Sequence, residues 1–478
     1  MSGAIRTTKN ATMLFAGTLT RMVASFGFII YAANHLGVEN FGKYALVVHY
    51  FELFISLTAA AAGILLTRDI ARWCGNRDKL FTAAATLVSF FALLAPLILL
   101  PASIGLGYSR DTLLALAIVC LGLVPAAVGV VYEAVFVALE RAEFVTAGAT
   151  IESLFRVVVS LWVLWLGYGI VELAVVMVLS RVTLVIAYFG LLRYFFNHRL
   201  QFNWKATWRF ASRWRIFAAE NWMATIYTSL DVIVLSAFIG EAAVGLYSAA
   251  WRYVRLGSVM AKSFTTAVFP VLSRAFYQSR ESFQQIFQHA MRGMCLIALP
   301  IVAGVTVIPQ QVVDLIYKQE YAAAAPVLQV LIWILLLEFI NPFLSHVLFS
   351  QGKQRLSMYV AAMGLISNSI LMVVLVNQLG VIGAAYACVF SGLVATLCYL
   401  YFTAELGLLP VLLREILRIS VAASVMGLAV YQVAEHGWLV IAPVSVGVYL
   451  LMLVVVQAIR MSDLHLIKEK FSHRAYAS

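Results

Sequence analysis

The stretch LGVENFGKYA at residues 36–45 occurs a second time, as IGEAAVGLYS at residues 239–248. Three positions of the first copy recur 203 residues later: Gly37 as Gly240, Gly42 as Gly245 and Tyr44 as Tyr247. Each copy joins two long apolar segments, so we expect a short glycine-containing turn at a membrane face. A chain that repeats itself near half its length is expected to form two similar lobes.

A second pair of segments supports the same division. Residues 138–141 (ALER) correspond to residues 350–353 (SQGK) at an offset of 212, and Gly167 corresponds to Gly380 at an offset of 213. Both members of each pair again lie between apolar segments. Two independent repeats favour duplication over coincidence.

Composition indicates a multi-pass membrane protein. Of the 478 residues, 63% are hydrophobic and 12% are charged, with a mean hydropathy of +0.94. A soluble core could not bury that much apolar surface. The five cysteines show no paired spacing and mostly lie in apolar runs, so we interpret them as small core residues: Cys74, Cys120, Cys295, Cys388 and Cys398.

The apolar pattern predicts an all-α membrane protein with 14 transmembrane helices. The first apolar run is too long for a signal-peptide core and is interpreted as the first span. The predicted spans are 11–33, 42–66, 81–105, 112–138, 144–166, 170–192, 216–239, 244–270, 290–309, 323–349, 356–378, 381–403, 412–434 and 438–458.

The distribution of basic residues predicts the orientation of these spans. Outside them, 24 Lys and Arg side chains fall in loops on one side and only Lys43, Arg110 and Lys318 on the other. Cytoplasmic loops carry the excess of positive charge, so both termini are expected in the cytoplasm. The copies of the opening motif would then lie on the outer face.

The longest connection, residues 193–215, joins spans 6 and 7. It interleaves aromatic with basic residues, namely Trp204, Trp208, Phe210 and Trp214 with Lys205, Arg209, Arg213 and Arg215. This pattern is typical of an amphipathic helix at an anionic membrane surface, and a plain linker between lobes is its simplest role. Nucleic-acid binding is disfavoured for a segment held at a lipid surface.

Six basic residues lie inside the predicted spans: Arg21, Arg156, Arg181, Arg252, Arg255 and Lys262. A charge facing lipid at mid-depth costs about 2.5 kcal/mol or more, so these side chains need a water-filled cavity, an acidic partner or a path to the interface. The three on span 8 fall within about 80° of one another around a helix. Together with Arg21 near mid-depth, they could hold an anionic group such as phosphate or pyrophosphate.

Neutralisation in pairs is the simpler alternative for several of these cations. Glu152 and Arg156 are four residues apart and could pair within one helix. Asp231 falls at the predicted depth of Arg252, and Glu52 at that of Arg181. Local acids cannot neutralise the whole stripe on span 8. The remaining polar positions are more typical of structural roles: Glu133, Glu220, Glu338 and His346.

No catalytic or metal-binding motif is present in the sequence, which disfavours an enzyme. No cofactor is expected, and transport would draw on Na⁺, H⁺ or the membrane potential. Asp231, Glu52, Arg156 and Arg181 are candidates for coupling or for charge pairing.

Several segments resemble one family, the polysaccharide flippases of the O-antigen type, in the multidrug/oligosaccharidyl-lipid/polysaccharide exporter superfamily. They are residues 17–53 (GTLTRMVASFGFIIYAANHLGVENFGKYALVVHYFEL), 68–72 (RDIAR), 239–254 (IGEAAVGLYSAAWRYV), 269–276 (FPVLSRAF), 299–305 (LPIVAGV) and 379–392 (LGVIGAAYACVFSG). The resemblance covers about residues 5–405.

The resemblance implies two six-helix lobes around a central cavity and two additional C-terminal helices. The implied divisions are an N-lobe at 1–192, a cytoplasmic linker at 193–215, a C-lobe at 216–405, and spans 13 and 14 with a cytoplasmic tail at 406–478. The implied activity is alternating-access transfer of an undecaprenyl-pyrophosphate-linked oligosaccharide to the outer leaflet. Relatives that flip lipid II use arginines of spans 1 and 8, which match Arg21, Arg255 and the adjacent Arg252.

The implied setting is the bacterial inner membrane, with membrane lipids, and polymerase and chain-length proteins, as partners of a monomer. A lipid II flippase and a drug exporter are alternatives within the superfamily, although span 1 carries Arg21 and no carboxylate, which argues against cationic drugs. A membrane glycan polymerase or ligase is a further alternative. It would need a large outer loop, and the predicted outer loops are short.

Overall fold

The structure, a computed structural model, describes residues 2–72, 77–196 and 201–457. All of its regular elements are helices, because apolar segments in lipid must satisfy their backbone hydrogen bonds internally. The elements are α1 (Ser2–Ile55), the π-helix η1 (Ser56–Ala60), α2 (Ala61–Arg72), α3 (Arg77–Gly105), α4 (Arg110–Ala138), α5 (Ala142–Trp165), α6 (Ile170–Phe196), α7 (Trp204–Phe238), α8 (Glu241–Gln278), α9 (Arg280–Val307), α10 (Pro309–Asp314), η3 (Gln319–Tyr321), α11 (Ala324–Leu331), α12 (Trp333–Ser350), α13 (Gln354–Leu379), α14 (Val381–Phe402), η4 (Ala404–Leu406), α15 (Leu409–Gln432) and α16 (Trp438–Val455).

Among the described residues, 11 helical segments are long and apolar enough to cross a membrane. One of them, Arg21–Arg72, includes predicted span 2 and much of span 1. The predicted spans at 216–239 and 412–434 correspond to α7 and α15, which are not among the 11. The chain is therefore a multi-pass helical membrane protein, and the count of 14 spans stays a prediction.

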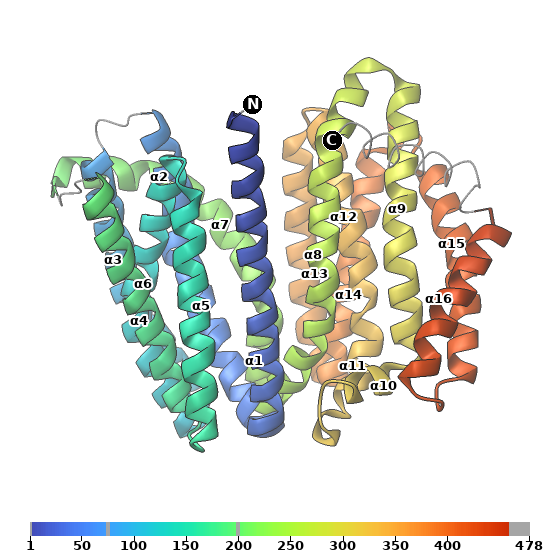
Figure 1. Ribbon diagram of the computed structural model, residues 1–478, viewed down its shortest axis with the longest axis horizontal. Helices are drawn as coiled ribbons and strands as arrows, with labels where there is room; N and C mark the ends of the chain where they lie inside the picture. The colour runs from blue at the N-terminus through green and yellow to red at the C-terminus, as the bar shows by residue number, and fades with distance from the viewer. Residues whose placement is uncertain (1, 73–76, 197–200, 458–478) are drawn as a thin grey trace. The chain divides into compact units, whose positions relative to one another are not determined.

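The helices form two compact units, residues 1–245 and residues 246–478. In unit 1, α4 packs between α3 and α6 (Figure 1). In unit 2, α13 packs along α14, and α15 packs on α9 and α16. The hydroxyl of Tyr449 on α16 donates to the backbone oxygen of Leu296 on α9 at 3.0 Å, which ties the last helix to this unit.

The helix α7 packs within unit 1. Its Arg213 forms a 2.7 Å ion pair with Asp69 of α2, and the ring of Trp214 lies 4.8 Å from that of Phe91 on α3. Unit 1 therefore extends beyond the predicted N-lobe boundary at 192. The predicted N-lobe, linker and C-lobe are groups of helices that would each move as one body during transport. This division of the chain stays a prediction. Residues 197–200 of the linker and 458–478 of the tail lie outside the described residues.

Positive backbone φ angles mark the same places in both repeats. Gly37 and Gly240 have φ of 74° and 109°, and Gly167 and Gly380 have φ of 82° and 65°. Glu140 and Gly352, which are separated by 212 residues, have φ of 58° and 71°. The repeats therefore share positive φ angles at all three pairs, including the one pair, Glu140 and Gly352, whose residue types differ.

The two copies of the opening motif meet inside unit 1. A methyl group on Gly42 would overlap the backbone oxygen of Glu241, and one on Gly245 would overlap that of Val38. Both pairs of residues obey the 203-residue offset of the repeat, so the contact is reciprocal. Only glycine allows two backbones to approach this closely.

Polar groups hold the same end of unit 1 together. Glu241 accepts hydrogen bonds from the backbone nitrogen and the hydroxyl of Ser109, both at 3.1 Å, at the N-terminus of α4. A carboxylate is favourable there because a helix N-terminus is positively polarised. The hydroxyl of Tyr108 lies 2.9 Å from that of Tyr50 and 2.7 Å from that of Ser236. These bonds link α1, α4, α7 and the first turn of α8.

The four described cysteines are free thiols. Cys120, Cys295 and Cys388 are buried and Cys398 is half-buried, as expected for small core residues. Cys74 lies outside the described residues.

Candidate functional site

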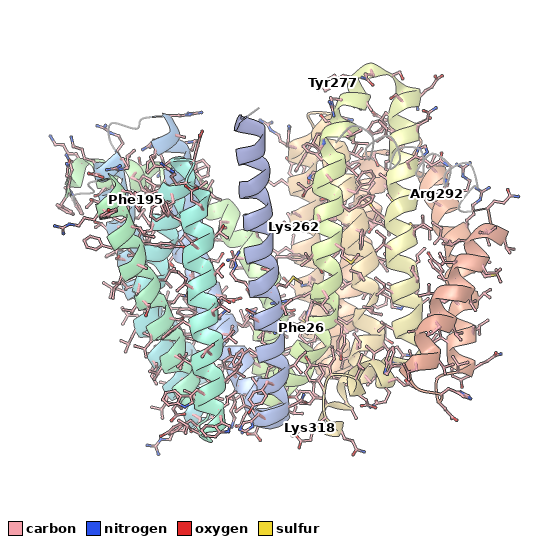
Figure 2. All side chains as sticks on the ribbon, in the orientation of Figure 1. Phe26, Phe195, Lys262, Tyr277, Arg292 and Lys318 are labelled. Atoms are coloured by element: carbon pink, nitrogen blue, oxygen red, sulfur yellow. The ribbon has the colours of Figure 1, made fainter. Side chains whose placement is uncertain are left out.

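The predicted cationic stripe lies on α8 of unit 2. Arg255 and Lys262 are exposed, and Arg252 is half-buried. No carboxylate of the described residues lies within 4.0 Å of Arg255 or Lys262. Figure 2 shows Lys262 part-way along α8, between Tyr277 near one end of unit 2 and Lys318 at the other. Two cations at interior positions of this helix thus lack a directly bound acid.

Two side chains of α12, Leu335 and Glu338, lie close to the α8 helix near Arg255. A methyl group on Gly257 would overlap the side chain of Leu335, so this leucine of α12 packs directly against α8. Glu338, one turn further along α12, interacts with Ser258 and acts electrostatically on Arg255. The Glu338 side chain thus lies within electrostatic range of Arg255 without forming an ion pair with it.

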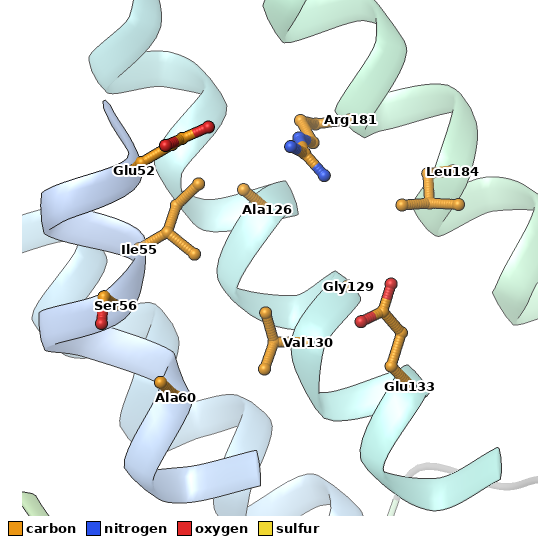
Figure 3. Close-up of a pocket in the computed structure, with 10 residues that line it drawn as sticks. All are labelled: Glu52, Ile55, Ser56, Ala60, Ala126, Gly129, Val130, Glu133, Arg181 and Leu184. Atoms are coloured by element: carbon orange, nitrogen blue, oxygen red, sulfur yellow. The ribbon is translucent and has the colours of Figure 1, made fainter. Parts of the chain in front are cut away.

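A second group of charges surrounds a cavity of about 270 Å³ in unit 1 (Figure 3). Glu52 of α1, Glu133 of α4 and Arg181 of α6 point into this space from three helices. The remaining lining is small or apolar apart from one hydroxyl: Ile55, Ser56, Ala60, Ala126, Gly129, Val130 and Leu184. A polar cavity of this size has room for several water molecules.

The carboxylate of Glu152 on α5 pairs with two arginines, one of which, Arg181, lines this cavity. Its carboxylate is 7% exposed and lies 3.8 Å from Nε of Arg156 and 3.9 Å from Nε of Arg181. The hydroxyl of Ser180 donates to the same oxygen at 3.0 Å. The pairing with Arg156 is the one predicted from the four-residue spacing, whereas the pairing with Arg181 joins two helices. One carboxylate therefore serves two guanidinium groups.

Glu133 has weaker partners. It accepts a hydrogen bond from the hydroxyl of Tyr188 at 3.3 Å, and no cation of the described residues lies within 4.0 Å of it. Arg181 and Arg21 act on it electrostatically from α6 and α1. Glu52 likewise has no ion pair within that distance in the described part of the chain. Of these two carboxylates, Glu133 thus lies in the field of two arginines without forming an ion pair with either.

The π-helix η1 forms one wall of the cavity and is bonded to α7. Asn221 donates to the backbone oxygen of Ser56 at 2.9 Å, and Trp222 donates to that of Leu57 at 2.6 Å. The hydroxyl of Thr225 lies 2.7 Å from that of Ser56. A π-helix displaces backbone carbonyls from their usual partners, and such segments are frequent at functional sites. The sequence reasoning missed these residues because a π-helix has no compositional signature.

The remaining predicted site residues lie in different units. Arg21 belongs to α1 of unit 1, so a joint pyrophosphate site with the α8 cations stays a prediction. Asp231 on α7 is buried and accepts a hydrogen bond from the backbone nitrogen of Val232 at 2.9 Å. Its predicted pairing with Arg252 would also join the two units and likewise stays a prediction. The side chain of Glu220 lies outside the described set.

His346 packs against Phe269, with ring centroids 4.4 Å apart, as a structural residue would. In the described part of the chain, no group of three or more His, Cys, Asp and Glu is arranged to hold a metal ion.

Two family models match this chain. One, described as polysaccharide biosynthesis protein, covers residues 7–276, and the other, described as lipid II flippase MurJ, covers residues 199–455. Among curated relatives, "Probable low-salt glycan biosynthesis flippase Agl15" of Haloferax volcanii is 22% identical over 37% of this chain and 38% of its own length. "Probable flippase AglR" of the same organism is 23% identical over 80% of each chain. The alignment thus spans well under half of the first relative and most of the second.

The fold is also found in solved structures. The lipid II flippase MurJ in an inward closed conformation superposes with a TM-score of 0.77 at 16% identity, over 92% of this chain and 98% of that one. An inward-facing multidrug resistance transporter of the MATE family superposes with a TM-score of 0.64 at 17% identity, over 81% and 95%. At these identities the likeness concerns the fold alone.

Proposed function

This chain belongs to the polysaccharide biosynthesis protein family of flippases, within the MOP superfamily, and we propose that it flips a lipid-linked oligosaccharide across a membrane. The proposed cargo is an undecaprenyl-pyrophosphate-linked glycan, carried from the cytoplasmic to the outer leaflet of a bacterial inner membrane. Both termini would be cytoplasmic. A monomer would suffice, and polymerase and chain-length proteins would act on the exported glycan.

The observation that carries this proposal is the pair of exposed cations, Arg255 and Lys262, in the interior of α8. A cation facing lipid at that depth costs about 2.5 kcal/mol or more, so the stripe is expected to face water or a ligand. A pyrophosphate group carries several negative charges, and a guanidinium binds phosphate oxygens in a bidentate manner. Arg255 is assigned the bidentate contact, and Lys262 acts as a point charge further along the stripe.

Alternating access would move this anion between the two membrane faces. The net attraction of the stripe must remain modest, because a site that binds too tightly would not release its cargo. Coupling to H⁺, Na⁺ or the membrane potential is proposed to involve Glu52 and Glu133, the carboxylates that face the cavity of unit 1.

A lipid II flippase is the second candidate. It is favoured by the MurJ family model over residues 199–455. The two cargoes share a pyrophosphate and differ in the attached glycan, so the α8 stripe serves either of them. A direct comparison of the two lipids therefore decides between them.

The test is flipping by the purified full chain in proteoliposomes, measured as the fraction of glycan that becomes accessible to an external glycosidase. Arg255→Ala should reduce the rate at least tenfold, because it removes charge-assisted bonds to the cargo. Arg255→Lys separates charge from bidentate geometry, and Lys318→Ala serves as the control cation on a loop. Normal flipping by Arg255→Ala would refute the site. Transport of lipid II alone would agree with the proposed site but would identify lipid II as the cargo.

A further inference from the structure

The first half of α7 carries an exposed patch that the proposed transport cycle does not use. It consists of Trp204, Lys205, Trp208, Arg209 and Arg215, all exposed on one helix. At 100° per residue, these five positions fall within about 140° of one another. They are called the α7 patch below.

The opposite face of the same helix is already packed. Phe210 is fully buried, and Trp214 is 5% exposed, with its ring centroid 5.9 Å from that of Trp222. Thr207 and Ala218 continue this buried stripe. The aromatic residues of the sequence pattern thus divide into two sets, and the buried set cannot insert into a membrane. Of the four aromatic residues in the predicted surface helix, Trp204 and Trp208 are the exposed ones.

Contacts within unit 1 hold the helix in place. The side chain of Asn203 caps it by accepting from the backbone nitrogen of Ala206 at 3.0 Å. Arg213 pairs with Asp69, and the guanidinium of Arg68 lies 5.0 Å from the ring centroid of Phe217. The α7 patch is therefore presented on a fixed support.

Within the described part of the chain, no acidic side chain pairs with the cations of the patch. No carboxylate of the described residues lies within 4.0 Å of Lys205, Arg209 or Arg215. The two indoles beside them are 66% and 71% exposed, at Trp204 and Trp208 respectively. Water alone is a poor environment for two exposed indoles, whereas the boundary between lipid and water suits an indole and a cation together.

We propose that the α7 patch binds the headgroups of anionic phospholipids in the cytoplasmic leaflet. Anionic phospholipids are the ligand that the chemistry of the patch favours. The three cations can bind lipid phosphates, and the indole side chains prefer the depth of the headgroup layer. The leaflet follows from the predicted orientation, which places this end of α7 in the cytoplasm. The patch would draw anionic lipids to the end of unit 1 that holds Asp69, whichever glycan is transported.

The experiment measures lipid selectivity at the patch itself. A fluorophore is attached at Ser212→Cys, an exposed position on the same face, in a full-length chain without its native cysteines. The chain is reconstituted in vesicles containing phosphatidylglycerol or phosphatidylcholine with quenching headgroups. Each cation near an anionic surface contributes about a fivefold factor in association. The label should therefore report a preference of at least tenfold for phosphatidylglycerol.

Matched variants test the cause of that preference. Lys205→Gln, Arg209→Gln and Arg215→Gln together should reduce the preference to about onefold. The control triple of Arg274→Gln, Arg355→Gln and Arg418→Gln makes the same change in charge at exposed positions of unit 2 and should leave the preference unchanged.

Equal quenching by both lipids in the parent chain would overturn the proposal, as would an unaffected preference in the patch triple. A patch triple that keeps the phospholipid preference but loses binding of undecaprenyl pyrophosphate would assign the patch to the cargo instead. Trp204→Ser with Trp208→Ser should lower quenching by both lipids equally, because the indoles set depth and carry no charge. These variants keep Phe210, Trp214 and Arg213, so the packed face of α7 remains intact.

Discussion

Replacing Gly42 with alanine should destabilise unit 1 through a single contact. The added methyl group would lie 2.9 Å from the carbonyl carbon of Glu241, about 0.5 Å short of the 3.4 Å at which ordinary contact begins. It would overlap the carbonyl oxygen more severely. Both atoms belong to the backbone of the first turn of α8, so no side-chain rotation can relieve the overlap. The helix must move.

Overpacking of this kind costs about 1–3 kcal/mol. Alanine recovers up to about 1 kcal/mol of helix propensity relative to glycine. Gly190→Ala on α6 is the matched control, because a methyl group there meets no atom within 4 Å. The Gly190 variant should therefore gain the free energy of helix propensity without any cost of overlap. The two variants are thus expected to differ by about 1–3 kcal/mol in the free energy of unfolding, with the Gly42 variant the less stable.

Thermal unfolding in detergent measures this difference in a chain that keeps Cys120 as its single cysteine, because this buried thiol becomes accessible to a thiol-specific dye when unit 1 opens. At about 2–4 °C per kcal/mol for a unit of this size, the midpoints should differ by about 2–12 °C. Gly245→Ala should behave like Gly42→Ala, and the double variant should lose less than the sum, because the first methyl group already separates the backbones. A Gly42 variant as stable as the Gly190 control would refute the close approach.

Three other changes have defined outcomes. Glu152→Gln should destabilise the chain by about 3 kcal/mol in thermal unfolding, because it leaves two guanidinium groups without their shared carboxylate; neutralising both arginines as well should restore part of the loss. Trp222→Phe should cost about 1 kcal/mol by removing the bond to the backbone oxygen of Leu57, while the exposed Trp438→Phe should cost little. Glu140→Gly should raise the midpoint by about 1–3 °C, because glycine adopts the φ of 58° without strain; a lower midpoint would show that Glu140 contributes more than its backbone angle.

Helices and turns could be predicted from the sequence because their determinants are local. Apolar runs specify helices in lipid, and the repeated glycines located turns whose positive φ angles the structure shows at Gly37 and Gly240. The repeat also gave the offset that pairs Gly42 with Gly245. It could not reveal that these residues touch, since a contact across 203 residues depends on tertiary packing.

Ion pairs could likewise be predicted from the sequence where the two residues are close in the chain, and not where the pair joins two helices. The Glu152–Arg156 pair could be predicted from an i, i+4 spacing. Shared depth suggested Glu52 for Arg181, and both do line one cavity, yet the ion pair of Arg181 is with Glu152 on a neighbouring helix. Depth in a membrane constrains only one coordinate of a side chain. The position of each helix in the membrane plane and its rotation about its own axis set the other two.

The reciprocal contact between Gly42 and Gly245 also bears on how such a chain could arise. In an ancestor built from two identical halves, a residue on the two-fold axis faces its own copy, so any substitution enters the interface twice. A methyl group that one side could accommodate would then collide with itself. Fusion of the halves removes that constraint, because each position afterwards mutates alone. In this chain glycine stands at both positions, as a backbone-to-backbone contact of this kind requires on either side.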